Sequence, residues 1–88
     1  MKIKVELFGV CREFSNQDHI DINFNDKISV QELRKKILDV ANDKFPENKN
    51  YHEMVKKSAF CYNDEIVSDE LTFDTNQTVS IIPPIGGG

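Results

Sequence analysis

Polar and apolar residues alternate in two stretches near the start of the chain, residues 2–8 and residues 19–24. The apolar positions that share one face in each stretch are Ile3, Val5 and Leu7, then Ile20, Ile22 and Phe24. A period of two predicts half-buried strands, and we expect the two stretches to pair as an antiparallel hairpin. Gly9 interrupts the first stretch, so residues 9–18 are expected to form a loop.

The clearest helix signal in the chain begins at Ser29. Ser29 and Glu32 form the S-x-x-E pattern of a capping box, in which each side chain satisfies a free backbone N–H. The apolar residues that follow at intervals of three and four are Val30, Leu33, Ile37 and Val40 or Ala41. This spacing predicts a helix to residue 43 with one buried stripe. The basic residues Arg34, Lys35 and Lys36 fall on the opposite face, and we expect them to be solvated.

The second half of the chain divides into short segments. Residues 44–57 begin as a polar loop, and Tyr51, Met54 and Val55 weakly indicate a short second helix. Strands are expected at residues 59–62, 66–67 and 78–82, with turns at residues 63–65 and 75–77. The last strand is so apolar that it belongs inside the sheet, most simply parallel to the first strand.

This order of elements predicts an α+β fold. A hairpin, a helix and a return to the sheet place the main helix on one face of a mixed sheet. With a right-handed crossover, the arrangement is the β-grasp, or ubiquitin-like, roll. We expect residues 1–82 to form this domain and residues 83–88 to project as a C-terminal tail.

The tail itself has an unusual composition, Pro83-Pro84-Ile85-Gly86-Gly87-Gly88. Proline has a fixed φ and no N–H, so the diproline ends the strand and directs the chain outward. Glycine has no Cβ, so the final residues could enter a channel too narrow for other side chains. The pattern predicts a folded body with a stiff neck and a thin tip that ends in a carboxylate.

Two apolar residues at the root of this tail fall out of phase with the core. Phe8 follows Leu7 and Ile82 follows Ile81, so both point away from the buried face. In parallel neighbouring strands they would lie at the same end of the sheet. They therefore form either a docking patch beside the neck or a surface buried beneath residues 9–18.

Composition narrows the possible functions. The chain has 88 residues, a formal net charge of −4 and two cysteines, Cys11 and Cys61. The acidic balance argues against nucleic acid as a partner. The sequence contains neither a membrane span nor a signal peptide, so we expect a cytoplasmic protein with reduced thiols. The two cysteines have no nearby histidine and His19 has no second ligand at a useful spacing, so no metal site is predicted.

Several stretches carry a resemblance to a known family. They are Val5-Glu6-Leu7-Phe8-Gly9-Val10-Cys11-Arg12-Glu13, Ser29-Val30-Gln31-Glu32-Leu33-Arg34 and Ile81-Ile82-Pro83-Pro84-Ile85-Gly86-Gly87-Gly88. Together they resemble the small subunit of molybdopterin synthase, a ubiquitin-like sulfur carrier, over nearly the full chain. The strand that leads into P-P-apolar-x-G-G is the most specific part. Two departures are the segment 44–57, which is longer than usual, and the turn 74–77, which lacks the usual Asp-Gly.

The resemblance implies a carrier cycle centred on Gly88. An ATP-dependent adenylating enzyme would convert its carboxylate into an acyl-adenylate, and a persulfide donor would replace AMP to leave a thiocarboxylate. The tail, residues 83–88, would then insert into a large catalytic subunit within a heterotetramer, where the sulfur attacks the pterin precursor. By the same resemblance Phe8, Arg12 and Ile82 are interface positions, and the chain alone is neither an enzyme nor a cofactor-binding protein.

Other functions remain open from the sequence. A carrier for another pathway, such as thiamine synthesis, would share the fold, although such carriers are typically shorter and lack the paired prolines. A ubiquitin-like modifier joined to lysines through Gly88 would share the adenylation step. A plain interaction domain would need no intact tail.

Overall fold

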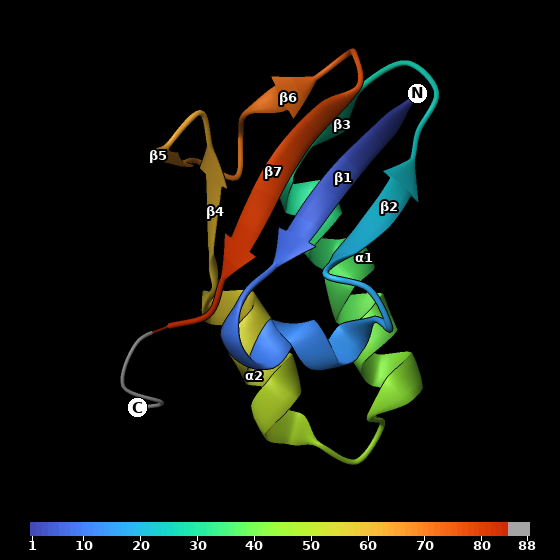
Figure 1. Ribbon diagram of the computed structural model, residues 1–88, viewed down its shortest axis with the longest axis vertical. Coiled ribbons are helices and arrows are strands. Elements are labelled where there is room, and N and C mark those ends of the chain that lie inside the picture. The colour runs from blue at the N-terminus through green and yellow to red at the C-terminus, as the bar shows by residue number, and fades with distance from the viewer. Residues whose placement is uncertain (85–88) are drawn as a thin grey trace.

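The computed structural model describes residues 1–84, which fold as a twisted sheet with a long helix along one face (Figure 1). In chain order the elements are β1 (Lys2–Leu7), the 3-10 helix η1 (Gly9–Phe14), β2 (His19–Asn23), β3 (Ile28–Ser29), α1 (Val30–Lys44), α2 (Lys49–Lys57), β4 (Ala59–Tyr62), β5 (Glu65–Val67), β6 (Thr72–Phe73) and β7 (Gln77–Ile82). The α+β class predicted from the sequence is confirmed.

The main sheet has the strand order β2-β1-β7-β4-β5. β1 and β2 form the predicted antiparallel hairpin, in which Val5 lies opposite Ile20. β7 runs parallel to β1 and antiparallel to β4, so the closing strand occupies the centre of the sheet as predicted. The first and last strands thus lie side by side and the main helix connects the two halves of the sheet, which is the β-grasp arrangement.

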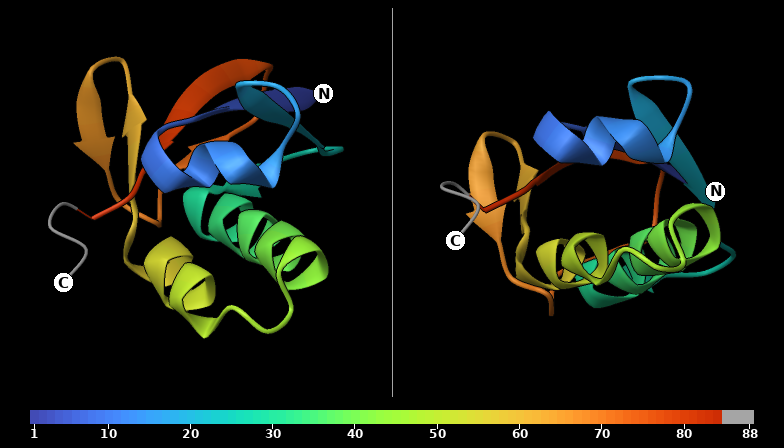
Figure 2. Two further views of the ribbon diagram at one scale, coloured as in Figure 1. Left: turned by 60° about the horizontal axis from the view of Figure 1, so that its bottom comes forward. Right: turned by 90° about the horizontal axis from the view of Figure 1, so that it is seen from below.

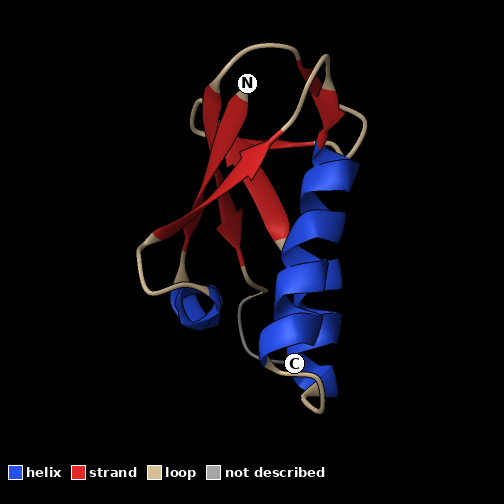
Figure 3. Cartoon of the chain, turned by 90° about the vertical axis from the view of Figure 1, so that its right-hand side faces the viewer, coloured by secondary structure: helices blue, strands red, loops and turns tan. Residues whose placement is uncertain are grey.

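Helix α1 begins at the capping box predicted from Ser29 and Glu32. The Ser29 hydroxyl accepts a hydrogen bond from the Glu32 backbone N–H at 3.1 Å, and Glu32 Oε1 accepts one from the Ser29 N–H at 3.2 Å. The stripe of Val30, Leu33, Ile37 and Ala41 is fully buried. Figure 3 shows α1 lying along one face of the sheet, where this stripe packs.

One continuous core forms between the helix and the sheet. Alternate residues of the central strands supply its sheet side, namely Ile3, Val5, Leu7, Phe60, Val79 and Ile81. Because side chains of a strand alternate between its faces, the residues between them point to the other side of the sheet. That second face, called the outer face below, is not covered by a helix within residues 1–84 and is the side seen in Figure 1.

A small second sheet was not predicted. β3 and β6 pair antiparallel, with Ile28 opposite Phe73, and both of these side chains are buried. Two residues per strand are too few for a period of two to be recognised, so the pairing depends on contacts that only the folded chain makes. One of these is the hydrogen bond from the Val30 N–H to the Leu71 carbonyl at 2.9 Å.

The expectation of a loop over residues 9–18 is wrong for its first half, which is helix η1. Cys11 and Phe14 point inward from η1 and are buried. Their spacing of three matches the 3-10 period of three residues per turn, and this signal was present in the sequence. The ring of Phe14 meets that of Tyr51 edge-on at 5.9 Å, which joins η1 to α2.

The weakly indicated second helix is confirmed as α2, but it starts earlier than expected. Asn48 caps it by accepting a hydrogen bond from the Tyr51 N–H at 3.1 Å. The expectation that Arg34 is solvated is wrong, since its side chain is only 17% exposed and pairs with Asp69. Arg34 also donates to the carbonyl oxygens of Val55 and Ser58 at the end of α2.

Candidate functional site at the end of the central strands

The parallel register of β1 and β7 brings two exposed apolar side chains together. Leu7 lies opposite Ile81. Phe8 follows Leu7 and Ile82 follows Ile81, so these two residues lie next to each other at the same end of the two strands. Phe8 is 49% exposed and Ile82 is 37% exposed. The strand alternation therefore predicted their orientation correctly, and burial of Phe8 beneath residues 9–18 does not occur.

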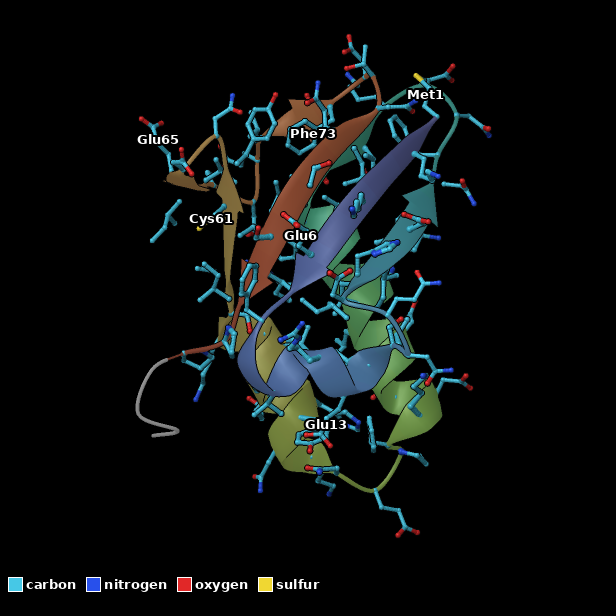
Figure 4. The ribbon with its side chains drawn as sticks, in the orientation of Figure 1. Met1, Glu6, Glu13, Cys61, Glu65 and Phe73 are labelled. Carbon is cyan, nitrogen blue, oxygen red and sulfur yellow. The ribbon has the colours of Figure 1, made fainter. Side chains whose placement is uncertain are left out.

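The apolar surface continues across the sheet onto β4 and β5. Ala59 lies opposite Ile82, and Cys61 lies opposite Ile66. Residues directly opposite in a ladder share a face, so Phe8, Ile82, Ala59, Cys61 and Ile66 form one band on the outer face, called the outer apolar band below. Figure 4 looks onto this face, with Cys61 labelled on β4.

Ile66 is the most exposed large apolar residue of the described chain, at 76%. It stands on the edge strand β5, which a tight turn at Asn63 and Asp64 joins to β4. Both turn residues have positive φ, 52° and 65°, as the favoured two-residue hairpin turns require. The sequence analysis did not include Ile66 or Cys61 in the site. The apolar residues on both faces of the strand 59–62 did indicate that part of this strand would be apolar on the outer face.

The polar part of the outer face lies toward β2. Lys2 pairs with Asp21 at 3.8 Å, and the imidazole of His19 is hydrogen-bonded to the carboxylate of Asp18 at 2.9 Å. This hydrogen bond lowers the pKa of Asp18. The apolar band is thus confined to the half of the sheet beside the neck.

The neck starts directly after the band. β7 ends at Ile82, and Pro83 and Pro84 follow outside the sheet, the first half-buried and the second exposed. Pro83 packs closely over Gly9, which has a φ of +56° at the start of η1. Ile85, Gly86, Gly87 and Gly88 lie outside the described residues, so the predictions made for them stay predictions.

Arg12, the third predicted interface residue, is exposed on η1 beside this region. Within residues 1–84 it makes no ion pair, and its neighbour Glu13 instead accepts a hydrogen bond from the Tyr51 hydroxyl at 2.7 Å. That bond raises the pKa of Tyr51. Figure 4 labels Glu13 where η1 passes over α2. Arg12 is therefore available to a partner, on a helix that directly follows Phe8.

The two cysteines have different surroundings. Both are free thiols. Cys11 is buried, and loss of solvation raises its pKa to about 11, although a hydrogen bond with Ser58 opposes the shift. A thiol with such a pKa is protonated at neutral pH and a poor nucleophile. In the described part of the chain no three His, Cys, Asp or Glu side chains are grouped as a metal site would require.

A family model described as the ThiS family matches residues 5–88. The chain belongs to the ThiS family. Its members are ubiquitin-like sulfur carriers, small proteins that are not themselves catalysts. A search of curated proteins finds no match to this ThiS-family chain. None of the helices within residues 1–84 has the length and apolar character needed to cross a membrane.

Two solved structures share the fold. A Pyrococcus furiosus protein assigned as molybdopterin converting factor, subunit 1, superposes with a TM-score of 0.70 at 24% identity, over 97% of this chain and 99% of that one. SAMP1 from Haloferax volcanii superposes with a TM-score of 0.66 at 16% identity, over the full length of both chains. At these identities the likeness shows the β-grasp fold of the ThiS-family chain.

Proposed function

We propose that this ThiS-family chain is the sulfur carrier of molybdopterin synthesis. The observation that carries the proposal is the convergence at one end of the sheet of Phe8, Ile82 and the diproline neck. A carrier needs a surface that holds its partner and a tip that reaches the reacting atoms, and these two parts adjoin each other here. Both ends of the chain resemble the small subunit of molybdopterin synthase, and for this reason we favour molybdopterin synthesis over other pathways that use a sulfur carrier.

In the proposed cycle the reactive group is the carboxylate of Gly88. A free carboxylate is a poor acyl donor, so an ATP-dependent enzyme activates it as an acyl-adenylate, with pyrophosphate as the leaving group. The terminal sulfur of a persulfide donor then attacks the acyl-adenylate and displaces AMP, which gives an acyl disulfide. A thiol reductant cleaves the S–S bond of that intermediate, becomes part of a disulfide itself, and leaves a thiocarboxylate on Gly88. The chain binds no cofactor in this scheme, because its own C-terminus carries the sulfur.

The sulfur is then delivered inside the large catalytic subunit. The outer apolar band, together with Arg12, would hold that subunit, while residues 83–88 enter its active site. Burial of an apolar cluster at the root of the tip fixes the direction of the tip and reduces the entropy lost when the sulfur meets the pterin precursor. Because the carrier is acidic, we expect the basic residues that bind the phosphate of the precursor to belong to the large catalytic subunit.

An intact-mass measurement tests the proposal. The chain is incubated with the adenylating enzyme of its host, ATP, a persulfide donor and a thiol reductant. A gain equal to replacement of one oxygen by sulfur, located on the Gly88 peptide, is the expected result. An unchanged mass with an enzyme active on another carrier would contradict the proposal. Deletion of Gly87 and Gly88 is the matched control, since it removes the acceptor and leaves the described fold unchanged.

A ubiquitin-like modifier joined to target lysines through Gly88 is the second candidate. The ubiquitin-like fold and a terminal glycine favour it, and it requires the same adenylate. The two functions differ in their products. Lysine-linked conjugates in cells would favour the modifier, whereas loss of molybdopterin synthesis without conjugates in a strain that lacks Gly87 and Gly88 would favour the carrier.

A further inference from the structure

A groove lies at the root of the tail, lined in part by Gly9 and Pro83, which directly follow Phe8 and Ile82 of the outer apolar band. Its volume is about 630 Å³, and its walls are η1, α2 and the neck. The residues that matter for its chemistry are Val10, Tyr51, Met54, Lys57, Pro83 and Pro84. Figure 2 shows η1 and α2 at the end of the molecule where the described chain leaves the sheet.

The floor and walls of the groove are mostly apolar. Val10 is exposed on η1, and Met54 is half-buried on the face of α2 that looks toward the neck. Methionine adapts its shape to different apolar partners because its side chain is unbranched and polarizable. The hydrogen bond from the Tyr51 hydroxyl to Glu13 fixes the distance between α2 and η1, so the groove is formed before any partner arrives.

The charged residues that line the groove are Glu53 and Lys57. Glu53 is paired with Lys56 at 3.3 Å. Lys57, which lines the groove, has no ion pair within residues 1–84. Although the whole chain is acidic, the electrostatics of this groove favour a carboxylate.

The position of the groove identifies its occupant. Gly88 lies four residues beyond Pro84, a reach of at most about 14 Å for an extended chain. Since Pro83 and Pro84 are part of the groove wall, an enzyme that encloses Gly88 lies within this reach of the groove. The first enzyme to do so in the proposed cycle is the one that adenylates the unmodified carboxylate.

We propose that the groove is a docking site for the adenylating enzyme, which inserts an apolar side chain next to Met54 and presents a carboxylate to Lys57. This inference rests on the proposed function and adds a second contact surface, on α2, to the outer apolar band. It assigns a role to the segment 44–57, which contains α2.

The test is the steady-state rate of ATP–pyrophosphate exchange by the purified adenylating enzyme of the same host, with the full-length chain as the varied substrate. Lys57→Glu and Val10→Asp change the groove at exposed positions and should leave the fold unchanged, which thermal unfolding checks. Lys49→Glu is the matched control, because it makes the same charge change at an exposed position of α2 that does not line the groove.

We expect Lys57→Glu and Val10→Asp each to raise the KM for the carrier by about tenfold with little change in kcat, since Gly88 and its reaction are untouched. Equal KM values for Lys57→Glu and Lys49→Glu would overturn the groove inference alone. Absence of exchange with the wild-type chain would overturn the proposed function together with this inference. The two failures are therefore distinguishable.

Discussion

The guanidinium of Arg34 forms a two-point ion pair with the carboxylate of Asp69, with Nη2 to Oδ1 at 2.7 Å and Nε to Oδ2 at 3.1 Å. The same guanidinium donates to backbone carbonyls at the end of α2 and lies 5.0 Å from the ring centroid of Phe60. One side chain of α1 thus joins α2, β4 and the loop before β6. The last carbonyl groups of a helix have no hydrogen-bond donor within the helix, and here Arg34 donates hydrogen bonds to such carbonyls at the end of α2.

We expect Arg34→Met to destabilise the fold by about 2–4 kcal/mol, because it leaves Asp69 and the carbonyls at the end of α2 without their donor. Arg34→Lys should recover little of this loss, since an ammonium cannot reproduce the planar fork. Urea unfolding gives the free energies. A double-mutant cycle with Asp69→Asn should show coupling of about 1–2 kcal/mol between the two side chains. Additive effects would mean that the ion pair contributes nothing.

Much of this fold was predictable because its signals are local. The period of two in β1 and β2, the capping box at Ser29 and the apolar stripe of α1 each depend on residues within a few positions of one another. The parallel pairing of β1 with β7 followed from the apolar character of the closing strand. The orientation of Phe8 and Ile82 followed from the same alternation.

The parts that were missed depend on contacts between distant residues. Arg34 sits on the polar face of α1, as its spacing indicates, but the end of α2 and Asp69 pack over it. β3 and β6 exist only because Ile28 and Phe73 meet across the fold. The groove at the neck combines three segments from different parts of the sequence, so no single stretch indicates it.

The outer apolar band gives a prediction about binding. Phe8→Ser and Ile82→Ser should weaken binding to the large catalytic subunit by at least about tenfold each, because both remove apolar area from the centre of the proposed interface. Both side chains are exposed, so the free energy of unfolding should change by only about 0.5 kcal/mol. Titration calorimetry with the purified subunit measures the affinity.

Leu71→Ser is the matched control for this binding test. Leu71 is 37% exposed, the same fraction as Ile82, but it precedes β6 and is not part of the band. It should bind the subunit as the wild-type chain does. If Leu71→Ser weakened binding as much as Ile82→Ser, the effect would come from general loss of apolar surface, and the band would not be the interface.

The buried thiol of Cys11 predicts a dependence of stability on pH. Its pKa rises from 9.0 to about 11 on folding, so the unfolded chain loses this proton at a lower pH than the folded chain does. The stability contribution is complete below pH 9 and is lost as the pH rises toward 11. We expect the wild-type chain to lose more stability over this interval than Cys11→Ala, which has no thiol to titrate. Denaturant unfolding of both proteins at several pH values measures the difference, and parallel curves would contradict it.

The contact between Gly9 and Pro83 gives the last prediction. A Cβ placed on Gly9 would lie 2.9 Å from Cγ of Pro83, and the φ of +56° at Gly9 is itself unfavourable for other residues. Gly9→Ala therefore meets two separate costs, about 1 kcal/mol for the left-handed backbone and a further cost for the collision with the ring. The collision displaces the ring of Pro83, the first residue of the neck, so sulfur loading at Gly88 should decrease as well as stability.

Two further variants separate these costs. Gly9→Asn also adds a Cβ but tolerates the left-handed backbone better than alanine, so most of the loss that it shares with Gly9→Ala comes from the collision. Pro83→Ala removes Cγ, and in the double variant it should restore the part of the stability that the collision costs. If Gly9→Ala were equally destabilising with Pro83 or Ala at position 83, the backbone alone would be responsible. The direction of the neck would then not depend on how closely Gly9 and Pro83 pack.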